Sequence, residues 1–258
     1  MSIKIGPAGT SGIGYVEGLN KCRELGLEAL EVEFTYGVRM SNQEAKEIGL
    51  LAKKNNVSLS VHGPYYINLA SLDKKKVAAS IKRIMDSCER AHYLGAKHVV
   101  FHAAFYQKFS KEECYNIVKK EIEGMQGAIK KNRWDVILSP EATGKASQFG
   151  DVDELLKLHN ETGCGFCIDF AHIKARNGKI DYDNLFGKLA RISHIHSHFS
   201  GIEYTKKGER KHIITPNEEI RKLLFFIKKY DKDATIINES PDPWGDCVKT
   251  KKILGELK

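Results

Sequence analysis

The sequence lacks the features of several protein classes. It has no apolar run near the ~20 residues that a membrane-spanning helix needs, and its first residues, MSIKIGPAGT, lack the apolar segment of a signal peptide. Six scattered cysteines are not the pattern of a secreted disulfide framework, and no proline- or serine-rich linker divides the 258 residues. We therefore expect a cytoplasmic protein with free thiols and a single domain spanning residues 1–258.

Two short motifs fail to predict the sites that they resemble. Cys164 and Cys167 form one CxxC pair at the start of an apolar run, with no second pair, which disfavours a zinc or redox site there. The glycine-rich stretch GPAGTSGIG has neither the dinucleotide-binding nor the P-loop spacing. We interpret that stretch as a flexible loop.

What the sequence contains instead is a repeated pattern of apolar or β-branched runs, separated by segments with apolar residues at helical spacing. The eight runs are IKIG (3–6), ALEVEF (29–34), SLSVHG (58–63), HVVFHA (98–103), VILSPE (136–141), GFCIDF (165–170), ISHIHSHFS (192–200) and TIINES (235–240). Strands that alternate with helices in a chain of this length predict an α/β fold, a (β/α)8 TIM barrel. An open, doubly wound parallel sheet is the alternative.

Six of the eight runs carry, at or near their ends, side chains that bind hard or borderline metal ions. The carboxyl ends of barrel strands meet at one mouth, where buried carboxylates and imidazoles are costly unless they are paired or bind a metal. Such ligands favour zinc, manganese or iron, and the lack of cysteine among them disfavours a closed structural site. The residues are His62, His102, Glu141, Asp169, His196 or His198, and Glu239.

Several segments resemble the endonuclease IV family of abasic-site endonucleases, which are xylose-isomerase-like TIM barrels. The resemblance covers nearly the whole chain and is carried by VHGPYYINLAS, VVFHAAF, LSPEATG, CIDFAHIKARNG and IINESP. It implies two or three zinc ions, with Mn²⁺ or Fe²⁺ as alternatives. The implied first ion is held by His62, His102 and Glu141, and the second by Glu141, Asp169, Glu239 and a histidine of the run 192–200.

Two details of this implied ligand set stay open. Both His196 and His198 fit the family ligand in the run 192–200, whereas His194 is expected to pack deeper as a structural residue. A third ion is implied at His172 and His212. There, however, Arg210 stands where the family has an aspartate, so either Glu209 substitutes with an offset of one residue or the third site is weak.

The implied reaction is cleavage of the phosphodiester 5′ to an abasic nucleotide in double-stranded DNA, as in base excision repair, by a metal-bound hydroxide with Glu141 at the centre. Arg39, Tyr65 and Tyr66 match positions that contact the damaged duplex, and the net charge of +8 suits a polyanion. We expect a monomer. The alternatives are a sugar isomerase or epimerase that uses the same mouth, and a barrel that binds DNA or a ligand without catalysis.

Overall fold

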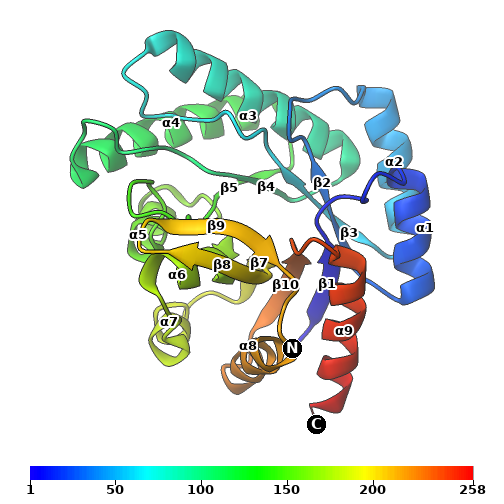
Figure 1. The fold of residues 1–258 in the computed structure, drawn as a ribbon. Coiled ribbons are helices and arrows are strands. Elements are labelled where there is room, and N and C mark those ends of the chain that lie inside the picture. Colours follow the sequence, from blue (N-terminus) through cyan, green and yellow to red (C-terminus); the bar gives the residue numbers. More distant parts are fainter. Residues whose placement is uncertain (258) are drawn as a thin grey trace.

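The computed structural model describes residues 1–257 and confirms the (β/α)8 barrel (Figure 1). The eight barrel strands are Ile3–Pro7 (β1), Ala29–Glu33 (β2), Ser58–His62 (β3), His98–Phe101 (β4), Ile137–Pro140 (β5), Ile168–Asp169 (β6), His194–Phe199 (β7) and Asp233–Asn238 (β10). Each strand runs parallel to its neighbours. All carboxyl ends therefore lie at one mouth, and the amino ends lie at the opposite end, which we call the base.

The barrel consists of two four-stranded sheets joined at two seams. The strand orders are β1-β10-β7-β6 and β2-β3-β4-β5. One seam is an isolated parallel bridge between Ala8 and Glu31, and the other is a bridge between Glu141 and Cys167. Backbone hydrogen bonds flank each bridge, including one of 2.9 Å from the Ala142 amide to the Cys167 carbonyl. The sheet therefore closes on itself, which excludes the open doubly wound alternative.

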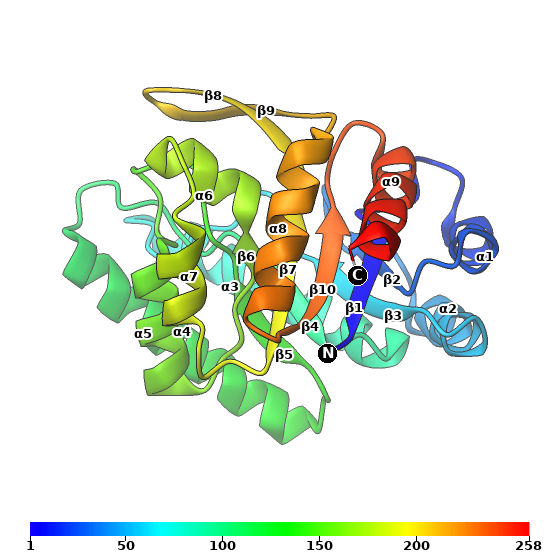
Figure 2. The ribbon, with the colours of Figure 1, turned by 90° about the horizontal axis from the view of Figure 1, so that it is seen from below.

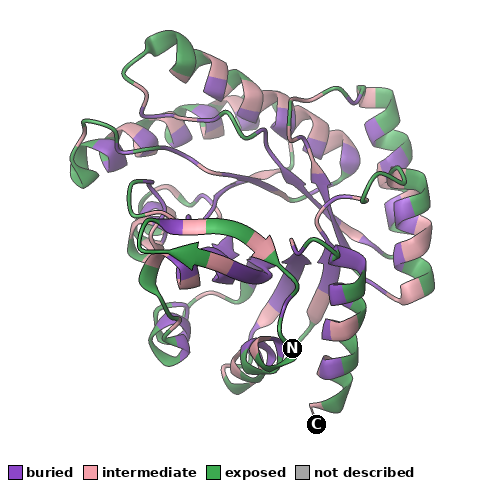
Figure 3. Cartoon of the chain, viewed as in Figure 1, coloured by how far each residue is buried: buried purple, intermediate pink, exposed green. Residues whose placement is uncertain are grey.

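Nine helices of the described chain surround the strands: Tyr15–Leu25 (α1), Asn42–Lys54 (α2), Lys74–Leu94 (α3), Lys111–Asn132 (α4), Val152–Thr162 (α5), Phe170–Asn177 (α6), Tyr182–Lys188 (α7), Asn217–Lys229 (α8) and Pro243–Glu256 (α9). Local sequence defines their ends. Ser110 and Asp151 form capping boxes with Glu113 and Glu154, and Gly95 ends α3 in the left-handed conformation. Their apolar faces pack inward and their polar faces point to solvent (Figure 3).

An antiparallel hairpin lies between β7 and α8, where the sequence predicted only a loop. It consists of Gly201–Thr205 (β8) and Gly208–Ile213 (β9) and projects from the mouth end of the barrel (Figure 2). The pairing shifts register between Glu203 and Tyr204, so Arg210 is the additional residue of a β-bulge. Since side chains alternate along a strand, this bulge turns Glu209 and His212 to the same face, although they are three residues apart.

All six cysteines are buried and unpaired, as expected for free thiols. Among the helices of residues 1–257, none combines the length and the apolar character that crossing a membrane requires.

Candidate metal centre

The mouth of the barrel gathers the side chains that end six strands. His62 ends β3, Asp169 ends β6 and His198 lies in the last part of β7, whereas His102, Glu141 and Glu239 directly follow β4, β5 and β10. Glu141, Asp169 and His198 are at most 1% exposed. The parallel strands thus bring together groups that are far apart in the chain.

A first group consists of His62, His102 and Glu141, whose ligand atoms lie within 4.8 Å of one another. The Nε2 atoms of His62 and His102 lie 3.2 and 3.0 Å from Glu141 Oε2. His62 donates its Nδ1 proton to the Gly63 carbonyl at 2.7 Å, which holds Nε2 toward Glu141, where it can bind a metal once it loses its own proton. This group can bind one cation with two imidazoles and a carboxylate.

A second group consists of Glu141, Asp169, His198 and Glu239, also within 4.8 Å of one another. His198 Nδ1 lies 3.1 Å from Glu141 Oε1 and 3.2 Å from Glu239 Oε1. His196 lies outside this group, because its Nε2 faces Glu31 Oε2 at 3.3 Å, deeper in the barrel. Of the two histidines that the sequence left open, the structure brings His198 to the mouth.

A third set of side chains meets at the edge of the mouth, below the hairpin. His172 Nε2 lies 3.2 Å from Glu209 Oε2, and the His172 and His212 rings lie 5.6 Å apart. Arg210 points outward and pairs with Glu203 at 2.8 Å. A side chain at Gly144 would meet the Glu209 carboxylate and displace it from this set. The β-bulge therefore explains the offset of one residue from the family's aspartate position, because it turns Glu209 toward the mouth and Arg210 toward solvent.

Lys145 changes the character of this third set. Its Nζ lies 3.2 Å from Glu209 Oε1, so an ammonium group already neutralises part of the glutamate charge. His212 also contacts Ser200 Oγ through Nδ1, at 2.6 Å. The third set consequently has fewer ligand atoms free for a cation than the first two groups.

The electrostatics of the mouth correspond to a site that needs positive charge. Burial opposes ionisation of Glu141, but His102 and His198 hold its pKa well below the ordinary value. Burial raises the pKa of Asp169 well above the ordinary value. Burial likewise opposes protonation of His62, yet its hydrogen bond to Glu141 and the charge of Glu33 raise its pKa to about 10. Protons on histidines thus balance the carboxylates in the metal-free protein.

The donor set fits divalent metal ions. Asp169 Oδ2 is buried inside the second group and makes no hydrogen bond, and the charged neighbour that faces it is His172 Nδ1 at 3.2 Å. A buried, unpartnered carboxylate oxygen is costly unless a cation binds it. Imidazole and carboxylate ligands suit zinc, manganese or iron.

Sequence reasoning missed two glutamates of β2. Glu31 is fully buried, and its Oε1 lies 2.8 Å from His198 Nε2 while Ser60 Oγ donates to its Oε2 at 2.6 Å. Burial raises the pKa of Glu33 to about 8, and its Oε1 has no hydrogen-bond partner. The alternation in ALEVEF was the available signal, because it turns both carboxylates to one face.

The three residues expected to contact DNA lie on loops that follow β2 and β3. Arg39 is exposed, and Tyr65 and Tyr66 are 59% and 66% exposed. The Tyr65 ring lies 6.2 Å from the His62 ring, so this tyrosine borders the first group. No contact within the described chain accounts for the exposed tyrosine faces.

Comparison with known proteins places the chain among related sequences. Residues 19–253 match the family model described as xylose isomerase-like TIM barrel. An uncharacterized protein of Methanocaldococcus jannaschii is 38% identical over 248 residues, which cover 91% of this chain and 90% of the relative. A probable endonuclease 4 of Metamycoplasma arthritidis is 26% identical over 210 residues, which cover 74% of each chain.

Solved structures with the same fold include different enzymes. Endonuclease IV from Thermus thermophilus superposes with a TM-score of 0.75 at 17% identity, covering 98% of this chain and 100% of that one. A D-tagatose 3-epimerase-like protein superposes with a TM-score of 0.74 at 19% identity, covering 98% of this chain and 96% of that one. The IOLI protein, whose structure contains a zinc atom, gives 0.74 at 14% identity and covers 99% of each chain. At these identities the superpositions establish the fold alone.

Proposed function

The chain belongs to the xylose isomerase-like TIM-barrel family, and from that premise we propose that it is a metal-dependent endodeoxyribonuclease that cleaves DNA 5′ to abasic sites. The observation that carries the proposal is the first group, in which His62 and His102 converge on Glu141 beside a separate carboxylate-rich group. Sugar isomerisation requires only the second group. Two adjoining groups that share one glutamate suit phosphodiester hydrolysis, which benefits from two cations.

When bound in these groups, divalent ions would supply Lewis acidity and activate water at neutral pH. The chain itself supplies the geometry. Glu141 directs Oε2 to the first group and Oε1 to His198 of the second, so one carboxylate serves both. Gly63 fixes the ring of His62 through its carbonyl, so the first group is preorganised.

The rim of the mouth would bind the duplex. Arg39 can pair with a backbone phosphate, and the exposed rings of Tyr65 and Tyr66 can fill the space left by a missing base. A nucleotide without a base stacks poorly, so extruding it into the mouth costs less than extruding an intact one. The chain's net charge of +8 adds a sequence-independent attraction that weakens as salt rises.

The direct test uses metal-replete protein and a duplex oligonucleotide that carries one tetrahydrofuran abasic analogue. We expect a nick on the 5′ side that leaves a 3′-hydroxyl, and we expect Glu141→Gln to abolish it. Glu123→Gln is the matched control, because Glu123 has a half-exposed side chain on α4, remote in the chain from the strand ends. Intact duplex despite bound metal would contradict the proposal.

A sugar epimerase is the second candidate, and Glu33 is the observation that favours it. Its carboxyl group is near enough to His62 and Glu239 for their charges to act on it, and its raised pKa allows proton exchange near neutral pH. An epimerase needs such a group, whereas hydrolysis of a phosphodiester does not. Incubation with a panel of ketohexoses, followed by chromatography of the sugars, distinguishes an epimerase from an endonuclease. We expect Glu33→Gln to abolish an epimerase activity and to leave DNA nicking unchanged.

A further inference from the structure

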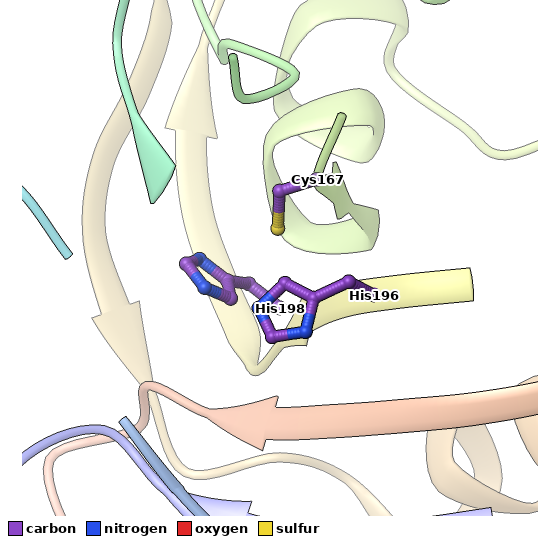
Figure 4. A group of neighbouring side chains, drawn as sticks. All are labelled: Cys167, His196 and His198. Atoms are coloured by element: carbon purple, nitrogen blue, oxygen red, sulfur yellow. The ribbon is translucent and has the colours of Figure 1, made fainter. Parts of the chain in front are cut away.

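A second cluster of metal-binding side chains lies one layer below the mouth. Cys167 precedes Asp169 by two residues on the chain, and His196 precedes His198 by two, so both pairs point into the barrel at successive levels. Ligand atoms of Cys167, His196 and His198 lie within 4.8 Å of one another. Figure 4 shows the Cys167 sulfur directed toward the two imidazole rings.

This cluster is unusual for the interior of a barrel, which is ordinarily filled by branched apolar side chains. Cys167 and His198 are fully buried and His196 is 3% exposed. His198 Nε2 and Glu31 Oε1 form an ion pair at 2.8 Å whose alignment is poor for a hydrogen bond. A buried imidazole and a buried carboxylate thus lie at the same level as a thiol.

We propose that Cys167, His196 and His198 bind a thiophilic transition-metal ion, such as zinc, inside the barrel, with Glu31 as the fourth ligand. A thiolate with imidazoles and a carboxylate is a set that zinc accepts in tetrahedral geometry. Glu31 lies within reach, since its Oε2 is 3.3 Å from His196 Nε2. Cys164 is not a ligand of this site, so the proposed site does not depend on the CxxC spacing of Cys164 and Cys167.

His198 belongs to this cluster and to the second group of the mouth. Its Nδ1 faces Glu141 and Glu239, while its Nε2 faces Glu31. An imidazole can bind metal through either nitrogen, so the ring can contact the mouth with one edge and the interior with the other. Loading the interior site releases the Cys167 thiol proton, and the ring loses its remaining proton if both nitrogens bind metal.

The base of the barrel offers a route to this site. Two cavities, of about 230 and 270 Å³, are both lined by His98, His194 and His196, and the second also reaches Cys164 and Phe166. The His98 ring stacks on His196 with centroids 4.6 Å apart and planes 8° apart. His98 Nδ1 also contacts the Ser139 hydroxyl at 2.9 Å, which fixes the orientation of its ring beside the route. Neutral imidazoles are good transient ligands for an incoming ion.

Cobalt(II) titration of the metal-free full-length protein tests the proposal, because only a thiolate ligand gives a near-ultraviolet sulfur-to-cobalt charge-transfer band. The mouth has nitrogen and oxygen ligands alone. We expect the band in the wild type, and we expect Cys167→Ser to lose it together with about one equivalent of cobalt. Cys164→Ser, a change at another buried cysteine outside the cluster, retains it.

Two further measurements keep the outcome decisive. His102→Gln impairs the first group of the mouth but leaves the band intact, because His102 is not part of the interior cluster, so a failure of the proposed nuclease does not imitate a failure of this site. If Cys167→Ser does not fold, X-ray absorption of the zinc-loaded wild type gives the answer from a sulfur neighbour at about 2.3 Å. A wild type without the band, a band that persists in Cys167→Ser, or zinc surrounded by nitrogen and oxygen alone would overturn the proposal.

Discussion

Both ends of the barrel gather histidines, yet the pKa of His62 at the mouth and that of His98 at the base are shifted in opposite directions. At the mouth, burial disfavours protonation of His62, but Glu141 and Glu33 outweigh it and raise the pKa to about 10. At the base, His98 contacts the Ser139 hydroxyl and the His196 ring, and burial lowers its pKa to about 3. Burial acts in the same direction at both ends, so neighbouring carboxylates decide the charge of these imidazoles.

The difference also separates two roles. Carboxylates at the mouth attract cations strongly, whether protons or metal ions, and a metal ion has to displace protons in order to bind. At the base, His98 has no carboxylate in direct contact, so burial lowers its pKa and it responds to acid through stability instead. The following predictions use this contrast, beginning with the largest effect.

Removing the shared carboxylate should affect the mouth most. Glu141→Gln eliminates the negative charge common to both groups, so we expect metal affinity to fall by more than about a hundredfold, beyond the cost of losing an outer-shell partner. Isothermal titration with zinc measures the loss, and Glu123→Gln serves as the control. Unchanged zinc affinity in Glu141→Gln would show that the two groups do not bind metal through this residue.

Single substitutions of the two histidines at successive levels of β7 should distinguish the contribution of the mouth to nicking from that of the interior. His198→Gln removes a ligand of the second group, and we expect abasic-site nicking to fall by about a hundredfold. His196→Gln changes the interior cluster and reaches the mouth through Glu31, so we expect nicking to fall by about tenfold at most. Single-turnover nicking rates of the two variants at saturating zinc make the comparison, and equal losses would contradict the assignment of His198 to the mouth.

The bulged hairpin should contribute less. Glu209→Gln weakens the third set around His172, and we expect a loss of about tenfold in nicking, whereas Arg210→Gln, which changes an outward side chain, should leave the rate within about twofold. The ratio of the nicking rates of these two variants tests whether the bulge directs Glu209 into the mouth and Arg210 away from it. A larger loss in Arg210→Gln would indicate that the arginine contacts DNA.

The base should respond to acid. Because the pKa of His98 is about 3 when folded and 6.5 when unfolded, the unfolded chain binds more protons between these values. Its contribution to stability is complete above pH 6.5 and decreases as the pH falls toward 3, by at most about 1.4 kcal/mol per pH unit. The free energy of unfolding, measured in urea across this pH range, should depend less steeply on pH for His98→Asn than for the wild type. An equal dependence on pH in the two proteins would contradict the prediction.

The sequence was sufficient to predict the barrel and most of the mouth, since parallel strands bring every terminal His, Asp or Glu to one end. It could not distinguish His196 from His198, because residues two apart on a strand point the same way. It could not place Glu209 either, since that depends on a bulge that only the pairing of β8 with β9 reveals. Glu31 and Glu33 were missed although their alternation was visible and Glu33 stands directly before a phenylalanine, as Asp169 does in the run 165–170.

The position of Glu141 at a seam has a consequence for how the barrel holds together. The sheet β2-β3-β4-β5 carries His62, and the other sheet carries Asp169 and His198. At one of the two seams between these sheets, Glu141 forms the bridge to Cys167. Metal ions bound on both sides of Glu141 would therefore link the two four-stranded sheets and stabilise the seam between them. Opening of this seam, measured by native-state hydrogen exchange at Ala142 and Cys167, should become rarer as metal is added, because ligand binding stabilises the closed state by mass action.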